Sequence, residues 1–243
     1  MKVCIAQTKS KKGDIQYNIV NHKKLIQLAT SYNADIIIFP ELSLTAYEPT
    51  LAKALAININ DNRLDDFQVI SNKKQIVIGL GAPTKIGSHV AISMIIFQPQ
   101  KPRQTYSKKY LHRDEEAFFV SGNSAIRSLG LRQNIALAIC YELSVPEHAE
   151  EAYKQGAEIY LVSAAKTVKG VEQAIPRLSE IASKYSIMAF MSNCVGEFDG
   201  CESGGKSSIW NNQGMLVGQL DHENEGLLIF DTESHKLITK IFK

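Results

Sequence analysis

Short, dense apolar runs, rich in β-branched residues, recur along the chain and alternate with stretches of helical periodicity. Runs of this length, bounded by Gly, Pro or Asn, are typical of strands that are buried on both faces. We expect strands over residues 3–6, 36–39, 76–80, 91–97, 135–139, 159–162, 187–191 and 227–230. We expect helices over residues 19–32, 64–72, 146–155 and 171–185. The alternation predicts an α/β fold in which sheets and helices form separate layers.

Two stretches, residues 75–106 and 207–242, hold consecutive expected strands without an intervening helix, which is typical of hairpins added to an alternating unit. The sequence Asn-Asn-Gln-Gly at 211–214 is a turn candidate in the second stretch. The C-terminal segment 236–243 alternates polar and apolar residues, so we expect an edge strand or an arm over a partner. Because no linker, repeat or low-complexity tract interrupts the pattern, we interpret residues 1–243 as one domain.

Composition and charge exclude several classes of protein. The 243 residues carry 27 Lys+Arg against 25 Asp+Glu, and the net charge of +2 leaves no electrostatic footprint for nucleic acid. No apolar run approaches the roughly 18 residues that a membrane-spanning helix needs. The N-terminal apolar stretch of about five residues is too short for a secretory signal. We therefore expect a cytoplasmic protein that binds neither nucleic acid nor membrane.

The cysteines indicate neither a disulfide framework nor a metal centre. Cys4, Cys140, Cys194 and Cys201 show no C-x-x-C spacing and no accompanying pair of histidines. We expect free thiols, with no metal and no other cofactor.

Three reactive or charged groups come directly after expected strands, where α/β proteins place their sites. Pro40 ends one strand and is followed by the carboxylate of Glu41. Cys140 closes another strand just before a helix, where backbone N–H donors lower a thiol pKa and hold an oxyanion. The charged segment 106–116, which contains Lys108, follows a third. Taken singly, the same features fit a solvated carboxylate, a core thiol and a charged surface loop.

Several blocks of sequence stand in a characteristic order along the chain. They are Val3-Cys4-Ile5-Ala6-Gln7, Pro40-Glu41, Tyr106-x-Lys108-x-x-Leu111, Cys140-Tyr141-Glu142 with Pro146-Glu147, Ser192-Asn193-x-Val195-Gly196 and Gly205-x-Ser207-x-Ile209. In this order the blocks resemble the nitrilase superfamily of carbon–nitrogen hydrolases over nearly the whole chain. The resemblance implies a four-layer α-β-β-α sandwich and a homodimer, or a larger homo-oligomer, that pairs through helices.

The resemblance also implies a catalytic triad of Glu41, Lys108 and Cys140. Glu41 is then the general base for attack of Cys140 on an amide carbon. The Lys108 ammonium and the backbone N–H of Tyr141 stabilise the oxyanion. Because a nearby carboxylate raises the pKa of a thiol, Cys140 is expected to rest in its protonated form.

Two choices within the charged segment follow from the family pattern. The tyrosine two positions before and the leucine three positions after favour Lys108 over Lys109. Many members carry a second glutamate after the lysine, and we assign this role to Glu116 rather than Glu115.

Departures from the family pattern leave the triad intact but bear on the substrate. Glu142 and Ser144 stand where the family often has Asp and Arg, and Ala46 replaces a frequent glycine before Tyr47. We take Tyr47 and Glu142 as candidates for the substrate pocket. We expect a cofactor-independent hydrolase of a small linear amide. An N-carbamoyl amine or amino acid is the nearest alternative substrate, followed by a nitrile.

Two further classes of function compete with this hypothesis. The segment from Gly200 to Ser207 satisfies the phosphate-loop pattern of NTPases, G-x-x-x-x-G-K-S. That pattern requires a following helix, whereas residues 208–214 are interpreted as a short strand entering a turn. A non-catalytic binding or thiol-sensing protein of the same fold is the other alternative, although an intact triad argues against it.

Overall fold

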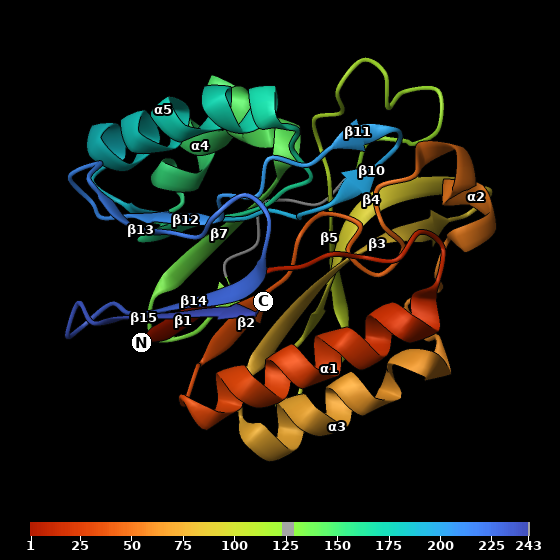
Figure 1. Cartoon of the computed structure of the whole chain (residues 1–243), viewed down its shortest axis with the longest axis horizontal. Helices are drawn as coiled ribbons and strands as arrows, with labels where there is room; N and C mark the ends of the chain where they lie inside the picture. Colours follow the sequence, from red (N-terminus) through yellow and green to blue (C-terminus); the bar gives the residue numbers. More distant parts are fainter. Residues whose placement is uncertain (123–128, 243) are drawn as a thin grey trace.

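The computed structural model describes residues 1–122 and 129–242, which form two sheets covered on their outer faces by helices (Figure 1). The strands of the first sheet are β1 Lys2–Gln7, β2 Ile36–Ile38, β3 Val77–Ile86, β4 His89–Phe97, β5 Gln104–Ser107, β14 Glu225–Asp231 and β15 Leu237–Phe242. Their order is β15-β14-β1-β2-β3-β4-β5. The three central strands β1, β2 and β3 are parallel, and the outer strands are added as antiparallel hairpins.

The second sheet repeats this plan on a smaller scale. Its strands are β6 Leu129–Gly130, β7 Asn134–Ile139, β8 Ile159–Ser163, β9 Met188–Ser192, β12 Ser208–Trp210 and β13 Leu216–Gln219. The order is β13-β12-β9-β8-β7-β6, with β7, β8 and β9 parallel to one another. A separate two-stranded ribbon is formed by β10 Glu197–Phe198 and β11 Cys201–Glu202.

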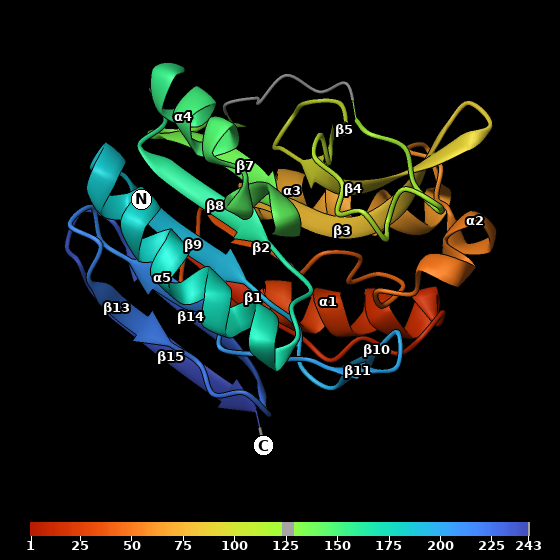
Figure 2. The ribbon, with the colours of Figure 1, turned by 90° about the horizontal axis from the view of Figure 1, so that it is seen from above.

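Helices form the two outer layers. On the first sheet lie α1 Ile15–Ser31 and α3 Asp65–Lys74, and on the second lie α4 Pro146–Lys154 and α5 Val168–Tyr185 (Figure 2). A short helix α2 Ala52–Leu55 and the 3-10 turns η1 Pro49–Leu51, η2 Asn62–Leu64 and η3 Cys140–Ser144 lie in the connections. Helix α1 begins four residues before the expected position, because the side chain of Asp14 caps it by accepting the N–H of Tyr17 at 3.0 Å.

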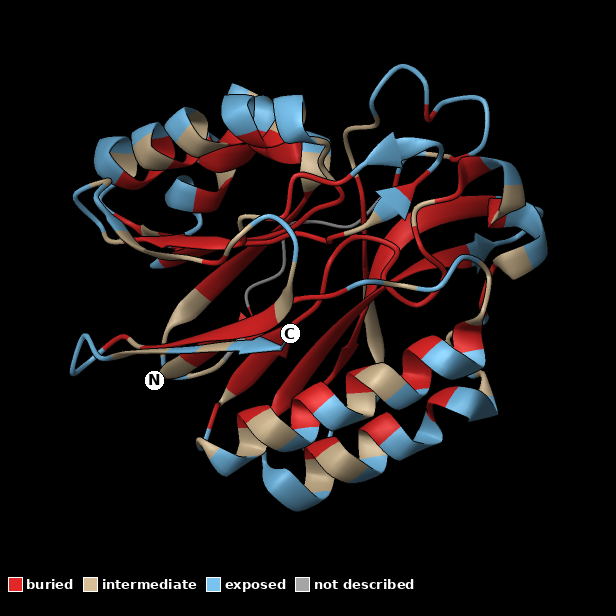
Figure 3. Ribbon diagram, viewed as in Figure 1, coloured by how far each residue is buried: buried red, intermediate tan, exposed pale blue. Residues whose placement is uncertain are grey.

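Strand alternation assigns each side chain to one of three cores. In β1, Val3 and Ile5 point between the two sheets, whereas Cys4 and Ala6 pack under α1 and α3. In β7, Leu137 likewise points between the sheets. The central strands are therefore buried on both faces, while the outward sides of the helices are exposed (Figure 3). This burial is why the strands appear in the sequence as continuous apolar runs.

The described elements confirm the expected strands and helices, with boundaries that shift by a few residues. The hairpin after β12 turns at residues 211–214, where Gly214 has a φ of +76°. Strand β15 lies at the edge of the first sheet, as its alternation predicted. Within the described residues, no helix is long and apolar enough to cross a membrane.

Candidate active site

The ends of strands β2, β5 and β7 bring Glu41, Lys108 and Cys140 to one place between the sheets. The two sheets are joined at this edge by hydrogen bonds. The hydroxyl of Ser163 donates to the carbonyl of Phe39 at 2.8 Å, and the N–H of Glu41 donates to the carbonyl of Ala164 at 3.3 Å. Because these bonds connect β2 to the end of β8, they set the position of Glu41 relative to the sheet that carries Cys140.

Lys108 is fully buried and is held between two carboxylates. Its Nζ donates to Oε1 of Glu41 at 2.8 Å and to Oε1 of Glu115 at 2.7 Å. Burial lowers the pKa of Lys108, but the negative charges of Glu41 and Glu115 and the hydrogen bond to Glu115 outweigh it and raise the pKa above the ordinary value. Lys108 is therefore a fixed positive charge at neutral pH.

The structure corrects our choice of the second glutamate. Glu115 is buried and forms an ion pair with Lys108, whereas Glu116 is exposed. Glu115 also accepts a hydrogen bond from the hydroxyl of Tyr47 at 2.9 Å and one from the backbone N–H of His112 at 2.7 Å. The loop path decides between the two adjacent residues, because a turn at residues 112–115 directs Glu115 inward.

Glu41 keeps one carboxylate oxygen free. Its Oε2 is buried and has no hydrogen-bond partner among the described residues. Burial raises the pKa of Glu41, the Lys108 ammonium opposes this, and the charge of Glu115 adds to it. The backbone at Pro40 and Glu41 runs close to Gly81 of β3. A Cβ added to Gly81 would lie 2.2 Å from the carbonyl oxygen of Pro40. Gly81 is required by this close approach.

Cys140 begins the turn η3 at a strained backbone position. Its φ is +46°, in the left-handed region that non-glycine residues rarely adopt. The half-buried sulfur lies 3.8 Å from the carbonyl oxygen of Ala165. Loss of hydration and the charge of Glu41 raise the pKa of Cys140 to about 11, despite opposing effects of Lys166 and Lys108. At neutral pH the group is therefore a thiol.

The N–H of Tyr141 lies next to this sulfur in the chain. Tyr141 is the second residue of a 3-10 turn, so no carbonyl within the turn can accept its backbone hydrogen. Its side chain is exposed and its ring meets that of His112 edge-on at 5.1 Å.

Glu142 has a different position from the one expected. It is fully buried and does not line the cavity at Cys140. Its carboxylate accepts the backbone N–H groups of Ile139 at 2.8 Å and Lys109 at 2.6 Å, and the hydroxyl of Tyr106 at 2.7 Å. Glu142 therefore connects the cysteine turn to the lysine loop, and the prediction that it contacts substrate is corrected. Burial raises the pKa of Glu142, and these hydrogen bonds oppose the rise.

A cavity of about 460 Å³ opens at Cys140. We call it the active-site cavity; its lining residues are Tyr47, His112, Asp114, Glu115, Cys140, Tyr141, Ser144, Ala165, Lys166, Thr167, Gly170, Gln173, Phe198, Asp199 and Cys201. The structure thus places Tyr47 where we expected it. The phenol remains protonated, because burial and the charges of Glu41 and Glu115 raise its pKa.

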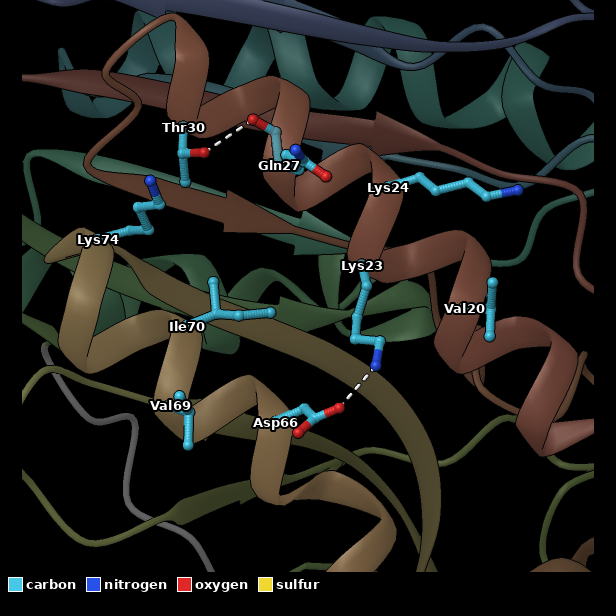
Figure 4. Close-up of a pocket in the computed structure, with 9 residues that line it drawn as sticks. All are labelled: Val20, Lys23, Lys24, Gln27, Thr30, Asp66, Val69, Ile70 and Lys74. Atoms are coloured by element: carbon cyan, nitrogen blue, oxygen red, sulfur yellow. Dashed lines mark hydrogen bonds and ion pairs between the residues drawn. The ribbon is translucent and has the colours of Figure 1, made fainter.

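Another cavity, of about 510 Å³, lies on the outer surface between α1 and α3 (Figure 4). Apolar side chains such as Val69 and Ile70 line it together with lysines, and Lys23 pairs with Asp66 at 2.6 Å across it. Its lining contains neither a cysteine nor a histidine.

The segment from Gly200 to Ser207 does not form a phosphate loop. The strand β12 follows it directly instead of a helix, so its N–H groups do not meet a helix N-terminus. The backbone N–H of Ser207 donates to the side chain of Gln7 at 2.9 Å, and Nδ2 of Asn193 donates to the carbonyl of Gly205 at 2.8 Å. These bonds attach the segment to both sheets.

Other features of the site bear on our remaining predictions. All four cysteines are free thiols, and Cys201 unexpectedly lines the active-site cavity. Across residues 1–122 and 129–242, no group of three or more His, Cys, Asp or Glu side chains could hold a metal ion. Lys166 was not predicted at all, because it follows a strand end without any motif around it.

Comparison with known proteins agrees with this arrangement. Residues 2–239 match the profile of the Carbon-nitrogen hydrolase family. The glutamine-dependent NAD(+) synthetase of Acinetobacter baylyi is 26% identical over 97% of this chain and 45% of that protein. An (R)-stereoselective amidase of Pseudomonas sp is 24% identical over 67% of this chain and 60% of that protein, and a nitrilase of Pyrococcus abyssi is 24% identical over 93% and 87%. The chain therefore spans less than two thirds of the synthetase and of the amidase.

Solved structures share the fold. The amidase from Nesterenkonia sp. AN1, in complex with butyramide, superposes with a TM-score of 0.86 at 23% identity, covering 97% of this chain and 92% of that chain. Another structure of this amidase gives a TM-score of 0.85 at 24% identity, covering 95% and 92%. The expected four-layer α-β-β-α sandwich is confirmed.

Proposed function

Because this chain belongs to the carbon–nitrogen hydrolase family, we propose that it hydrolyses a small linear amide through a cysteine thioester. The observation that carries this proposal is the buried Lys108, which two carboxylates hold beside a half-buried cysteine at the base of the active-site cavity. A lysine held in this way cannot lose its proton easily, so it serves as a permanent electrostatic group.

In the proposed first step, Cys140 attacks the carbonyl carbon of the amide. The thiol proton passes to Glu41, whose free Oε2 and raised pKa suit a proton acceptor. A carbon–sulfur bond forms, and the carbonyl oxygen becomes an oxyanion. The Lys108 ammonium and the N–H of Tyr141 stabilise that negative charge, which exists only in the transition state and the intermediate.

In the second half, the carbon–nitrogen bond breaks and Glu41 returns the proton to the departing nitrogen, so that ammonia leaves. A water molecule then attacks the thioester while Glu41 accepts its proton; the carbon–sulfur bond breaks and Glu41 returns the proton to the sulfur. The products are a carboxylic acid and ammonia, and Cys140 is restored as a thiol. Glu115 holds Lys108 in place through a second hydrogen bond, and Tyr47 donates a hydrogen bond to Glu115.

Ammonia release tests this function directly. The panel comprises primary amides including butyramide, N-carbamoyl amines and amino acids, and nitriles, because the site chemistry is shared among these substrate classes. We expect turnover of an amide, loss of turnover in Cys140→Ala, and a decrease of about 100-fold or more in Lys108→Ala. Turnover by Cys140→Ala equal to that of the unaltered protein would refute the proposal.

The same panel separates the enzyme from a non-catalytic protein of the same fold. A binding or thiol-sensing protein would release no ammonia from any panel member, although Cys140 would still react with an alkylating reagent. Mass spectrometry of the protein after brief exposure to substrate adds a second measurement, since a thioester on Cys140 increases its mass by that of the acyl group.

A further inference from the structure

Among the residues that the structure describes, Lys166 is the only lysine or arginine that lines the active-site cavity. It is half-buried, and its ammonium makes no ion pair or hydrogen bond with any other side chain in the described part of the chain. A half-buried cation without a partner has lost part of its hydration without gaining a counter-charge. It is therefore ready to bind an anionic group that enters the cavity.

The backbone of Lys166 is held firmly in place. Its N–H donates to Oδ1 of Asn193 at 2.8 Å, and its carbonyl accepts the N–H of Gly204 at 2.8 Å. Its side chain then runs past Gly170 in the first turn of α5. A Cβ on Gly170 would lie only 3.3 Å from the Cβ of Lys166, so the glycine leaves room for the lysine stem.

Lys166 is also close to the reacting sulfur. It directly follows Ala165, whose carbonyl oxygen lies 3.8 Å from the sulfur of Cys140. Its positive charge lowers the pKa of Cys140, against the larger effects of lost hydration and of Glu41. An amide bound in the cavity for attack by Cys140 would therefore lie within electrostatic reach of Lys166.

The acidic groups of the cavity do not neutralise Lys166. Glu115 is engaged by Lys108, and Asp114 pairs with His112. Asp199 is exposed at the cavity mouth, where water and salt screen its charge. The unpaired positive charge inside the cavity is therefore that of Lys166.

We propose that Lys166 binds a carboxylate at the far end of the substrate, so that the enzyme acts on short amides of dicarboxylic acids. This inference rests on the proposed function and specifies its substrate class. Lys166 is a specificity-determining residue in this scheme, because it contacts the part of the substrate that does not react. The ion pair adds binding energy for such substrates and none for a neutral amide of the same length.

Succinamate and butyramide form a matched pair of probes, since a carboxylate replaces a terminal methyl group. The test is to measure kcat/KM for both probes by ammonia release in the unaltered protein and in the variants Lys166→Met, Lys166→Arg and Lys169→Met. Lys169 is an exposed lysine of α5 outside the cavity and serves as the charge control. We expect a preference for succinamate that falls by about 10- to 100-fold in Lys166→Met. We expect the preference to be partly retained in Lys166→Arg and unchanged in Lys169→Met. Most of the change in Lys166→Met should lie in KM.

An equal preference in Lys166→Met and the unaltered protein would overturn the inference while leaving the amidase proposal intact. A second measurement does not depend on turnover: calorimetric titration of Cys140→Ala and of the double variant Cys140→Ala/Lys166→Met with both probes. Tighter binding of succinamate that disappears in the double variant supports the carboxylate site even if no amide is hydrolysed. Binding of the two probes with equal affinity by Cys140→Ala overturns it.

Discussion

At the scale of single residues, the charge balance around Lys108 distinguishes this site. One buried cation faces two carboxylates, so the cluster carries a net negative charge when both are ionised. Removing the cation leaves two buried charges of equal sign, whereas removing one acid leaves a balanced pair. The effects of substitution on stability and on activity should therefore differ in direction.

We predict that Lys108→Met lowers the free energy of unfolding by about 3–5 kcal/mol, because both carboxylates lose their partner. Glu41→Gln is expected to leave this free energy unchanged or to increase it, although it removes the general base. Urea denaturation at neutral pH provides the measurement. Equal destabilisation by the two substitutions would show that Glu41 is a stabilising partner rather than a charge kept for catalysis.

The raised pKa of Glu41 predicts the acidic limb of the pH profile. Glu41 must be ionised to accept the thiol proton, so kcat/KM should fall as pH decreases through a pKa above the ordinary value of 4.5. The same group binds its proton more tightly in the folded than in the unfolded state. Protonated Glu41 therefore stabilises the fold at pH values below its pKa in the unfolded state. This stabilisation is lost as pH rises through its pKa in the folded state.

Two measurements test this pH dependence. A pH–rate profile should show its acidic limb above pH 4.5, and a limb at or below that value would contradict the environment described for Glu41. Ultraviolet absorbance should reveal no thiolate of Cys140 at neutral pH, in keeping with its pKa of about 11. A stable thiolate there would mean that Glu41 is not needed as a proton acceptor.

At the scale of elements, a buried network aligns the two loops that carry the cysteine and the lysine. Glu142 in η3 accepts N–H groups from the end of β7 and from the loop after β5. Behind it, the hydroxyl of Tyr106 lies 2.9 Å from Nε2 of His148, and Nδ1 of His148 lies 2.7 Å from the hydroxyl of Tyr160. Burial lowers the pKa of His148 to about 4, so the ring is neutral in this network at physiological pH.

We predict that Glu142→Gln lowers kcat with little change in KM, because the amide nitrogen that replaces one carboxylate oxygen cannot accept the backbone N–H bound there, and the loops shift relative to each other. The free energy of unfolding should fall by about 1–3 kcal/mol, the cost of leaving buried donors without acceptors. Glu172→Gln on the exposed face of α5 is the matched control and should change neither quantity. A rise in KM alone would indicate that Glu142 contacts substrate after all.

At the scale of the whole molecule, the outer helix layers leave surfaces through which two copies can associate. On α4, Tyr153 is 51% exposed, and its ring stacks on that of Tyr185 at the end of α5 at 5.1 Å. Exposed aromatic side chains are enriched at protein interfaces because they bury large areas with few rotatable bonds. The helix-paired dimer that the family resemblance implies stays a prediction, and we place its contact on this surface.

We therefore predict a homodimer in which α4 and α5 of the two copies meet. Sedimentation analysis should give about twice the chain mass of 27.0 kDa, and Tyr153→Glu should shift the equilibrium toward monomer because it places a charge in the contact. Val69→Glu, at an exposed residue of the outer cavity between α1 and α3, is the control and should leave the dimer intact. A monomer at micromolar concentration would contradict the prediction.

The alternation of strands and helices followed from local sequence, whereas the four-layer order and the assignment of Glu41, Lys108 and Cys140 as a triad came from the family resemblance. Apolar runs buried on both faces predict strands because each side chain of such a strand must find a core. Glu41 and Cys140 could be singled out because each directly follows one of these runs. Lys108 follows a shorter strand, and the family pattern was needed to choose it over its neighbour Lys109.

Tertiary structure decided which side chains of the loops are buried. In loops, no periodicity relates the position of a residue in the sequence to the direction of its side chain. The choice of Glu115 over Glu116 depends on one turn, because rotating the chain by a single residue exchanges a buried side chain for an exposed one. The hydrogen bonds of Glu142 show that it connects the cysteine turn to the lysine loop. Lys166 could be proposed as a partner for substrate only from the tertiary structure, because the packing of the two sheets brings this lysine and Cys140, which are remote in sequence, to one cavity.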